Sequence, residues 1–210
     1  YFGSPVQRSS TLFLAAALVA CDTPSRDAFV GECGEYPEGQ FDYGQIGIGT
    51  CLSAPTDLFW EELNGESVLV VANANSFLDF ESGSILTLDA AAFPLDGSRV
   101  LMHNLADQGS AASVQIDSFA GGLAYVPERD LAAVSVRYSE GAENLEQEDA
   151  LVFVDLSDPS NPTLAAVAED GATQLTVGAD PLAVSYDSES GLAYVANITS
   201  GTISVVDMLS

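Results

Sequence analysis

Short runs of alternating apolar and polar residues come in pairs along this chain, and the paired pattern occurs three times. The clearest copy is LAYVANITSGTISVVD, from Leu192 to Asp207, in which two runs with a period of two flank a Ser-Gly turn. This pattern predicts a β-hairpin. A second copy runs from Val68 to Asp89, and a more divergent one runs from Leu131 to Leu156. A repeated hairpin predicts an all-β repeat architecture.

Further strands are expected on both sides of each hairpin. First strands are predicted at Asp57–Trp60, Leu123–Val126 and Leu182–Tyr186, and fourth strands at Ala112–Ile116 and Thr173–Val177. Four antiparallel strands per repeat are typical of a β-propeller blade. Residues 43–210 are therefore predicted to form a partial propeller, with blade 1 at about 54–117, blade 2 at about 122–178 and an incomplete blade 3 at about 180–210.

Three motifs identify a family resemblance. VGADP at Val177–Pro181, AYVAN at Ala193–Asn197 and SGTISVVD at Ser200–Asp207 resemble the YVTN-type β-propeller repeat. The first copy fits through VVANAN and SGSILTLD, whereas the second has Ser135-Val136 where Ala-Asn is expected. The resemblance implies a ring of four-stranded blades. Since propellers have about four to eight blades, the chain is expected to be an N-terminal fragment of a ring of about six to eight.

Two smaller features belong to the same pattern. Tyr43–Ile48 is expected to be an outer strand that closes the ring, because IGIGTCLSAP echoes LTVGADP. Asp89, Asp155 and Asp207 recur at the ends of the third strands. Aspartate at such a position caps a turn through side-chain-to-backbone hydrogen bonds, which is the role predicted here.

The N-terminal segment predicts export. Arg8 precedes an apolar run from Thr11 to Ala20, which is too short to span a bilayer but suits a signal peptide over residues 1–20. Leu18-Val19-Ala20-Cys21 resembles a bacterial lipobox, which implies lipidation of Cys21. Residues 21–42 then form a lipidated tether and irregular lead-in. The expected location is the bacterial cell envelope, anchored to a membrane and facing the periplasm or the exterior, with the choice of membrane open.

The two remaining cysteines are Cys33 and Cys51. Export places them in an oxidising compartment, where a disulfide between them is expected. A metal site is disfavoured, because His103 is the only histidine and no C-x-x-C motif occurs.

The charge balance is strongly acidic, with 31 Asp and Glu against 5 Lys and Arg and a net charge of −26. Such a surface repels phosphate backbones, so nucleic-acid binding is not expected. The acidity is interpreted as a feature that keeps a secreted protein soluble or suits a saline habitat. No cofactor is predicted; convergence of carboxylates on Ca²⁺ is the alternative, although no D-x-[DN]-x-[DN]-G loop is present.

The repeats differ most in the loop between their second and third strands. This loop is short at Ile198–Gly201 and longer at Asn75–Ser82 and Ser139–Ala150. Equivalent loops emerge on one face of a repeat protein, and insertions on one face often mark a binding surface. The binding-face candidates are Phe77, Asp79, Phe80, Glu81, Glu140, Glu143, Glu146, Glu148 and Asp149.

The predicted function is that of an envelope-anchored binding or scaffold module for a protein, peptide or polysaccharide. The alternative is a propeller enzyme that resembles lactonases or dehydrogenases, with a metal-dependent site completed by further blades. The first strands offer Asp57, Glu61, Glu62 and Asp187 for such a site, without an obvious constellation and with no catalytic residue assigned. A purely structural envelope component is the third possibility.

Overall fold

The computed structural model describes residues 52, 54–76, 82–92, 111–137, 149–167 and 171–210. These residues contain twelve β-strands and one 3-10 helix. The elements are β1 (Pro55–Leu63), β2 (Glu66–Asn73), β3 (Gly83–Asp89), η1 (Ala90–Ala92), β4 (Ala111–Ile116), β5 (Ala120–Val126), β6 (Leu131–Val136), β7 (Ala150–Asp155), β8 (Thr163–Leu164), β9 (Gln174–Thr176), β10 (Pro181–Asp187), β11 (Leu192–Asn197) and β12 (Thr202–Asp207). Within these ranges there is no α-helix, and no helix long and apolar enough to cross a membrane.

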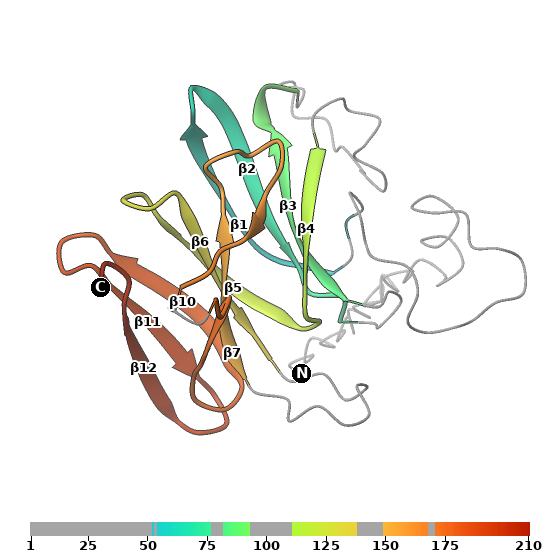
Figure 1. The fold of residues 1–210 in the computed structure, drawn as a ribbon. Coiled ribbons are helices and arrows are strands. Elements are labelled where there is room, and N and C mark those ends of the chain that lie inside the picture. Colours follow the sequence, from blue (N-terminus) through green and yellow to red (C-terminus); the bar gives the residue numbers. More distant parts are fainter. Residues whose placement is uncertain (1–51, 53, 77–81, 93–110, 138–148, 168–170) are drawn as a thin grey trace, which may run out of the picture.

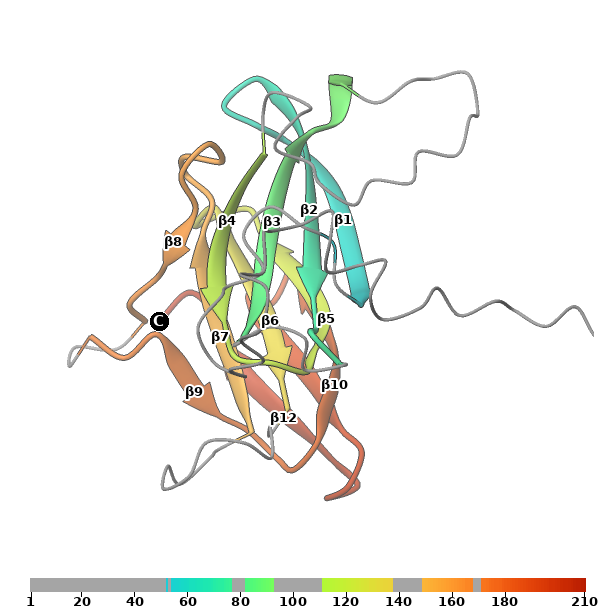
Figure 2. The same cartoon turned by 90° about the vertical axis from the view of Figure 1, so that its right-hand side faces the viewer.

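The strands form three antiparallel sheets, each built from strands that follow one another in sequence. Unit 1 has the order β1-β2-β3-β4, unit 2 has β5-β6-β7 with β8 and β9 on the remaining edge of β7, and unit 3 has β10-β11-β12. Figure 2 shows β8 and β9 lying one after the other beside β7. The prediction of an all-β fold with repeated antiparallel units is confirmed, while the described strands do not close into a ring.

The strand positions follow the hydrophobic pattern closely. The third strands end at Asp89, Asp155 and Asp207, as predicted. The predicted fourth strands correspond to β4 and β9. The two-residue strand β8 was not predicted, because Thr163–Leu164 is too short to carry an alternating pattern.

Unit 2 lies between the other two units (Figure 1). One apolar core joins unit 1 to unit 2 and contains Val70, Ile85, Val134 and Val152. A second core joins unit 2 to unit 3 and contains Phe153 and Val195. Strand β6 is buried at every position, which is why its apolar run is nearly continuous rather than alternating.

Both cores use the same pair of surfaces. The face of units 1 and 2 that packs on the following unit is called the forward face, and the face of units 2 and 3 that packs on the preceding unit is called the rear face. The strand registers identify the equivalent positions in all three units. The forward faces comprise Val70, Ile85 and Thr87 in unit 1, Ala133, Leu151 and Phe153 in unit 2, and Tyr194, Ile203 and Val205 in unit 3. The rear faces comprise Trp60, Leu69 and Val71 in unit 1, Tyr125, Ala132 and Val134 in unit 2, and Tyr186, Ala193 and Val195 in unit 3.

Several predictions concern residues outside the described ranges. These are the signal peptide, the tether, lipidation of Cys21, the Cys33–Cys51 disulfide, the strand at Tyr43–Ile48 and the position of His103. They stay predictions.

Candidate binding face at the Arg137–Asp180 end of the sheets

A left-handed residue stands immediately before the first strand of every unit. Its φ angle is 48° at Ala54, 63° at Phe119 and 60° at Asp180. Non-glycine residues seldom adopt this conformation, so its threefold recurrence marks a constrained site. The carbonyl of each residue accepts a hydrogen bond from the first residue after the second strand. The N–H donors are Ala74 at 3.1 Å, Arg137 at 3.2 Å and Ile198 at 2.9 Å, respectively.

The three hydrogen-bonded pairs of strand ends lie at one end of the sheets, and neighbouring pairs contact each other. The N–H of Phe119 donates to the carbonyl of Ala74, and the Asn75 amide donates to Ser118 Oγ at 3.0 Å, which links units 1 and 2. Arg137 and Asp180 link units 2 and 3. The residues that flank all three second-to-third-strand connections are therefore joined, as the sequence predicts for loops on one face.

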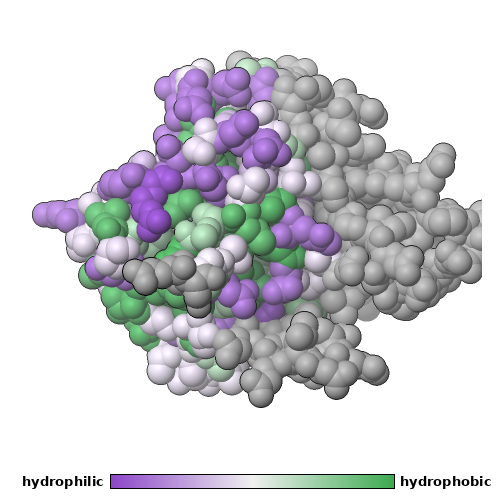
Figure 3. Space-filling model, in the orientation of Figure 1, coloured by the Kyte–Doolittle hydropathy of each residue, from purple (hydrophilic) through white to green (hydrophobic). Residues whose placement is uncertain are grey.

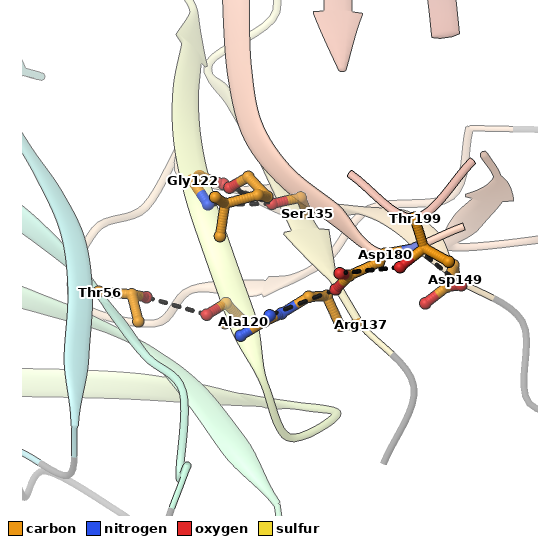
Figure 4. Close-up of polar contacts among 9 residues, drawn as sticks. Thr56, Ala120, Gly122, Ser135, Arg137, Asp149, Asp180 and Thr199 are labelled. Atoms are coloured by element: carbon orange, nitrogen blue, oxygen red, sulfur yellow. Dashed lines mark hydrogen bonds and ion pairs between the residues drawn. The ribbon is translucent and has the colours of Figure 1, made fainter. Parts of the chain in front are cut away.

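The Arg137–Asp180 node, which we define as Arg137, Asp149, Asp180 and Thr199, lies between units 2 and 3 (Figure 4). Arg137 Nη1 lies 3.2 Å from Asp180 Oδ1, and Thr199 Oγ1 donates to Asp180 Oδ2 at 3.2 Å. The Asp180 N–H donates to Asp149 Oδ2 at 3.0 Å. The Arg137 and Asp180 side chains are each 32% exposed. Within the described ranges, Arg137 Nε is buried without a hydrogen-bond partner.

Two hydroxyl groups join the first strands of neighbouring units (Figure 4). Thr56 Oγ1 lies 3.0 Å from the carbonyl oxygens of Ala120 and Gly121, to which it can donate. Ser135 Oγ accepts from the Gly122 N–H at 2.9 Å and donates to the Leu182 carbonyl at 3.1 Å. The departure of Ser135 from the repeat motif therefore has a structural reason, because its hydroxyl connects β5, β6 and β10.

Buried amides support the same end from inside the hairpins. Asn73 donates to Ser84 Oγ at 3.0 Å, and the Asn197 amide bonds to the hydroxyls of Thr202 and Ser204 at 3.2 and 2.9 Å. Both asparagines are almost fully buried. A buried amide needs such partners, since an unsatisfied one costs about 1–3 kcal/mol.

Of the predicted binding-face residues, the described ranges include Asp149 alone. It lies directly before β7, and its carbonyl also accepts from the Val177 N–H at 3.0 Å. Phe77, Asp79, Phe80, Glu81, Glu140, Glu143, Glu146 and Glu148 lie outside the described residues and stay predictions.

Two of the acidic residues noted on the first strands, Asp57 and Asp187, accept hydrogen bonds through their side chains. Asp57 Oδ2 accepts from the Leu123 N–H at 2.8 Å, which links units 1 and 2. Ser190 Oγ donates to Asp187 Oδ2 at 2.6 Å, and this bond, with one from the Glu189 N–H, holds the pKa of Asp187 below its usual value. No group of three or more candidate metal ligands occurs in the described part of the chain.

Two tyrosines mark the opposite end of the sheets. Tyr125 donates to Asp130 and Tyr186 donates to Glu128, each over 2.8 Å. Partial burial and the hydrogen bond to Asp130 raise the pKa of Tyr125. Partial burial and the hydrogen bond to Glu128 raise the pKa of Tyr186 to about 12. A carboxylate beside a phenol disfavours the phenolate, so both groups are held neutral.

The predicted capping role of the third-strand aspartates is confirmed. Asp89 Oδ1 accepts from the Ala91 N–H at 2.8 Å, Asp155 Oδ1 from the Ser157 N–H at 2.8 Å and Asp207 Oδ1 from the Leu209 N–H at 3.0 Å.

The sequence pattern did not indicate Arg137 and Asp180 as site residues. The available signal was the match between Ala54-Pro55 and Asp180-Pro181, since each pair places a turn directly before a first strand.

Comparison of the chain with protein-family models, curated proteins and solved structures gave no match.

Proposed function

We propose that the three units are successive blades of a β-propeller of about six to eight blades, and that this propeller is a binding or scaffold module. The observation that carries the proposal is the contact network running from Ala74 through Phe119 and Arg137 to Asp180 and Ile198. It brings the flanks of the connections 77–81 and 138–148 to one end of the sheets. A rigid scaffold that presents variable connections at one end is a common design for recognition.

The proposed ligand is a protein, peptide or polysaccharide of the bacterial envelope. The lipobox-like sequence at Leu18–Cys21 supports attachment to a membrane through Cys21. The acidic composition argues against a nucleic-acid partner, because like charges repel. The Arg137 side chain, 32% exposed, places a guanidinium group at this end for a carbonyl or carboxylate group of the ligand.

The test replaces residues 138–148 with Gly-Ser while retaining Arg137 and Asp149. Asp149 and Ala150 must stay, since Asp149 bonds to Asp180 and Ala150 pairs with Val136. The matched control shortens 93–110, the connection that leaves β3 at the other end of the sheets. Binding is measured to purified peptidoglycan by co-sedimentation and to envelope proteins by affinity capture.

The expected result is reduced binding for the 138–148 variant and unchanged binding for the control, with the same circular dichroism spectrum for both. Equal binding by wild type and the 138–148 variant would contradict the assignment of this end as the binding face.

A further inference from the structure

The connection between β1 and β2 is a two-residue turn formed by Asn64 and Gly65. The strand register pairs Leu63 with Glu66 across the turn, and the φ angles of Asn64 and Gly65 are 54° and 81°. Left-handed angles at both positions are typical of a type I′ turn, which favours Asn-Gly. Asn64, Gly65 and Glu66 are exposed. Figure 3 shows hydrophilic residues over the upper left of the molecule, where β1 meets β2 in Figure 1.

The Asn64 side chain joins unit 1 to unit 2. Its Nδ2 donates to the carbonyl of Ser157, in the turn that follows β7. The next unit repeats this contact: Arg129, in the turn between β5 and β6, donates through Nη1 to the carbonyl of Met208, which follows β12, at 3.2 Å. In both cases the turn after a first strand donates a side-chain hydrogen bond to the turn after the third strand of the next unit. The Asn64 amide is therefore one donor of a repeated contact between units.

A second hydrogen bond holds the turn after β7 against unit 1. Thr87 Oγ1 donates to the Pro159 carbonyl at 2.6 Å, and Thr87 is 2% exposed. The Asn64 contact is exposed, whereas the Thr87 contact is buried. Exposed hydrogen bonds open more readily than buried ones, because water competes for the same groups. The contact between units 1 and 2 should therefore open first at Asn64.

The sequence gives this turn a reactive backbone. Asn64-Gly65 is the only Asn-Gly pair in the chain. A glycine after asparagine has no Cβ to hinder attack by its own backbone nitrogen on the asparagine side chain. No atom lies within 4 Å of the position that a Cβ on Gly65 would occupy, so the surrounding structure also leaves this backbone open.

We propose that Asn64 is a site of spontaneous deamidation, and that its conversion removes the hydrogen bond between units 1 and 2 at this turn. The Gly65 nitrogen attacks Asn64 Cγ, so that a Cγ–N bond forms and the Cγ–Nδ2 bond breaks. Nδ2 leaves as ammonia, and the proton lost from the Gly65 nitrogen balances it. Water then opens the cyclic imide at either of its carbonyls, which gives aspartate or isoaspartate. Water is the single co-reactant, and no atom changes its oxidation state.

Both products lose the donor at this position. A carboxylate accepts hydrogen bonds and donates none, so it cannot bond to the Ser157 carbonyl. Isoaspartate also lengthens the main chain of a turn whose loop length fixes the strand register. The turn lies at the opposite end of the sheets from the Arg137–Asp180 node, since β1 runs from Pro55 to Leu63 between the two ends. The inference is therefore independent of the proposed binding function.

The hydrogen bond to Ser157 should control the rate of conversion. Ring closure rotates the Asn64 side chain, so the amide has to leave Ser157 before Cγ reaches the Gly65 nitrogen. Thr87→Val weakens the hold on the same turn and should raise the rate. Thr202→Val is the matched control, because it removes a hydroxyl partner of the Asn197 amide in unit 3 and should leave the rate at Asn64 unchanged.

The test incubates the folded full chain at mildly alkaline pH and follows conversion by ion exchange and by mass analysis of peptides. The converted protein gains one negative charge and about one dalton. The expected wild-type result is conversion at Asn64, while Asn73 and Asn197, both almost fully buried, stay intact. Gly65→Ala should slow the conversion strongly, because its Cβ hinders the attacking nitrogen. If Thr87→Val does not fold, wild type in urea below its unfolding transition replaces it, and conversion should again be faster.

The structural consequence is measured on Asn64→Asp, which has the side chain of one product. This variant should unfold at a lower urea concentration than wild type, because it lacks the donor to Ser157. Three results would overturn the proposal. They are a folded wild type that stays unconverted while the urea-unfolded chain converts, a conversion rate that does not change when the contact is weakened, and an Asn64→Asp variant that unfolds together with wild type.

Discussion

Arg137 and Asp180 form an ion pair, with Nη1 and Oδ1 3.2 Å apart, between the end of β6 and the start of β10. The same two residues also carry backbone roles. The Arg137 N–H bonds to Phe119, and the left-handed Asp180 accepts from Ile198 through its carbonyl. The pair therefore joins units 2 and 3 at the end where the variable connections begin.

Two substitutions of Asp180 should distinguish the contribution of its charge to stability from that of its left-handed backbone conformation. Asp180→Asn should cost about 0.5 kcal/mol, because the ion pair is partly exposed and asparagine tolerates the left-handed region. Asp180→Ala should cost about 1–2 kcal/mol, since alanine is strained at a φ of 60°. Urea unfolding measures both values. A double-mutant cycle with Arg137→Gln should give a coupling of about 0.5 kcal/mol, and no coupling would show that the pair contributes nothing.

Gly121 is expected to tolerate no side chain. A Cβ there would lie 2.5 Å from the Leu182 carbonyl oxygen and 2.6 Å from Ser135 Oγ. Gly121→Ala should therefore destabilise the fold by about 1–3 kcal/mol through overpacking between β5 and β10. Gly65→Ala is the comparison, because no atom lies within 4 Å and only the φ of 81° opposes alanine, at a cost of about 1 kcal/mol. Thermal unfolding compares the two; an equal or smaller loss at Gly121 would contradict the close approach.

The cap at Asp155 offers a test of the repeated turn. Asp155→Ala removes the acceptor for the Ser157 N–H and should cost about 0.5–1.5 kcal/mol. Asp155→Asn keeps an oxygen at this position and should retain most of the stability. Chemical denaturation of the two variants checks the assignment, and equal losses would indicate that the charge rather than the hydrogen bond matters.

Alkaline pH should destabilise the protein through Tyr186. Its pKa is raised from 10.0 to about 12 in the folded state, so folding favours the neutral phenol. The stabilisation is fully present below pH 10 and is lost as pH rises from about 10 to about 12. Wild type should therefore lose more unfolding free energy over this interval than Tyr186→Phe. Tyr194→Phe serves as the control, since Tyr194 is an exposed tyrosine of the same unit, and it should follow the wild-type profile.

Much of the secondary structure could be predicted from local pattern. The hairpins around Leu192–Asp207 and Val68–Asp89 and the caps at their terminal aspartates follow from alternation and turn chemistry, which are local properties. The candidate site was predicted only as a set of loops on one face. Arg137 and Asp180 are 43 positions apart in sequence, and nothing in either local pattern indicates that their side chains meet.

The sequence by itself determined the strands, their pairing into repeated antiparallel units and the turns that end them, because alternation with a period of two and short-range hydrogen bonding fix these features residue by residue. Only the tertiary structure decided which face of each sheet is covered. Tyr194 and Val70 occupy equivalent strand positions, yet one is 37% exposed and the other fully buried. Burial depends on whether a neighbouring sheet packs against that face, and packing between sheets joins residues that are distant along the chain.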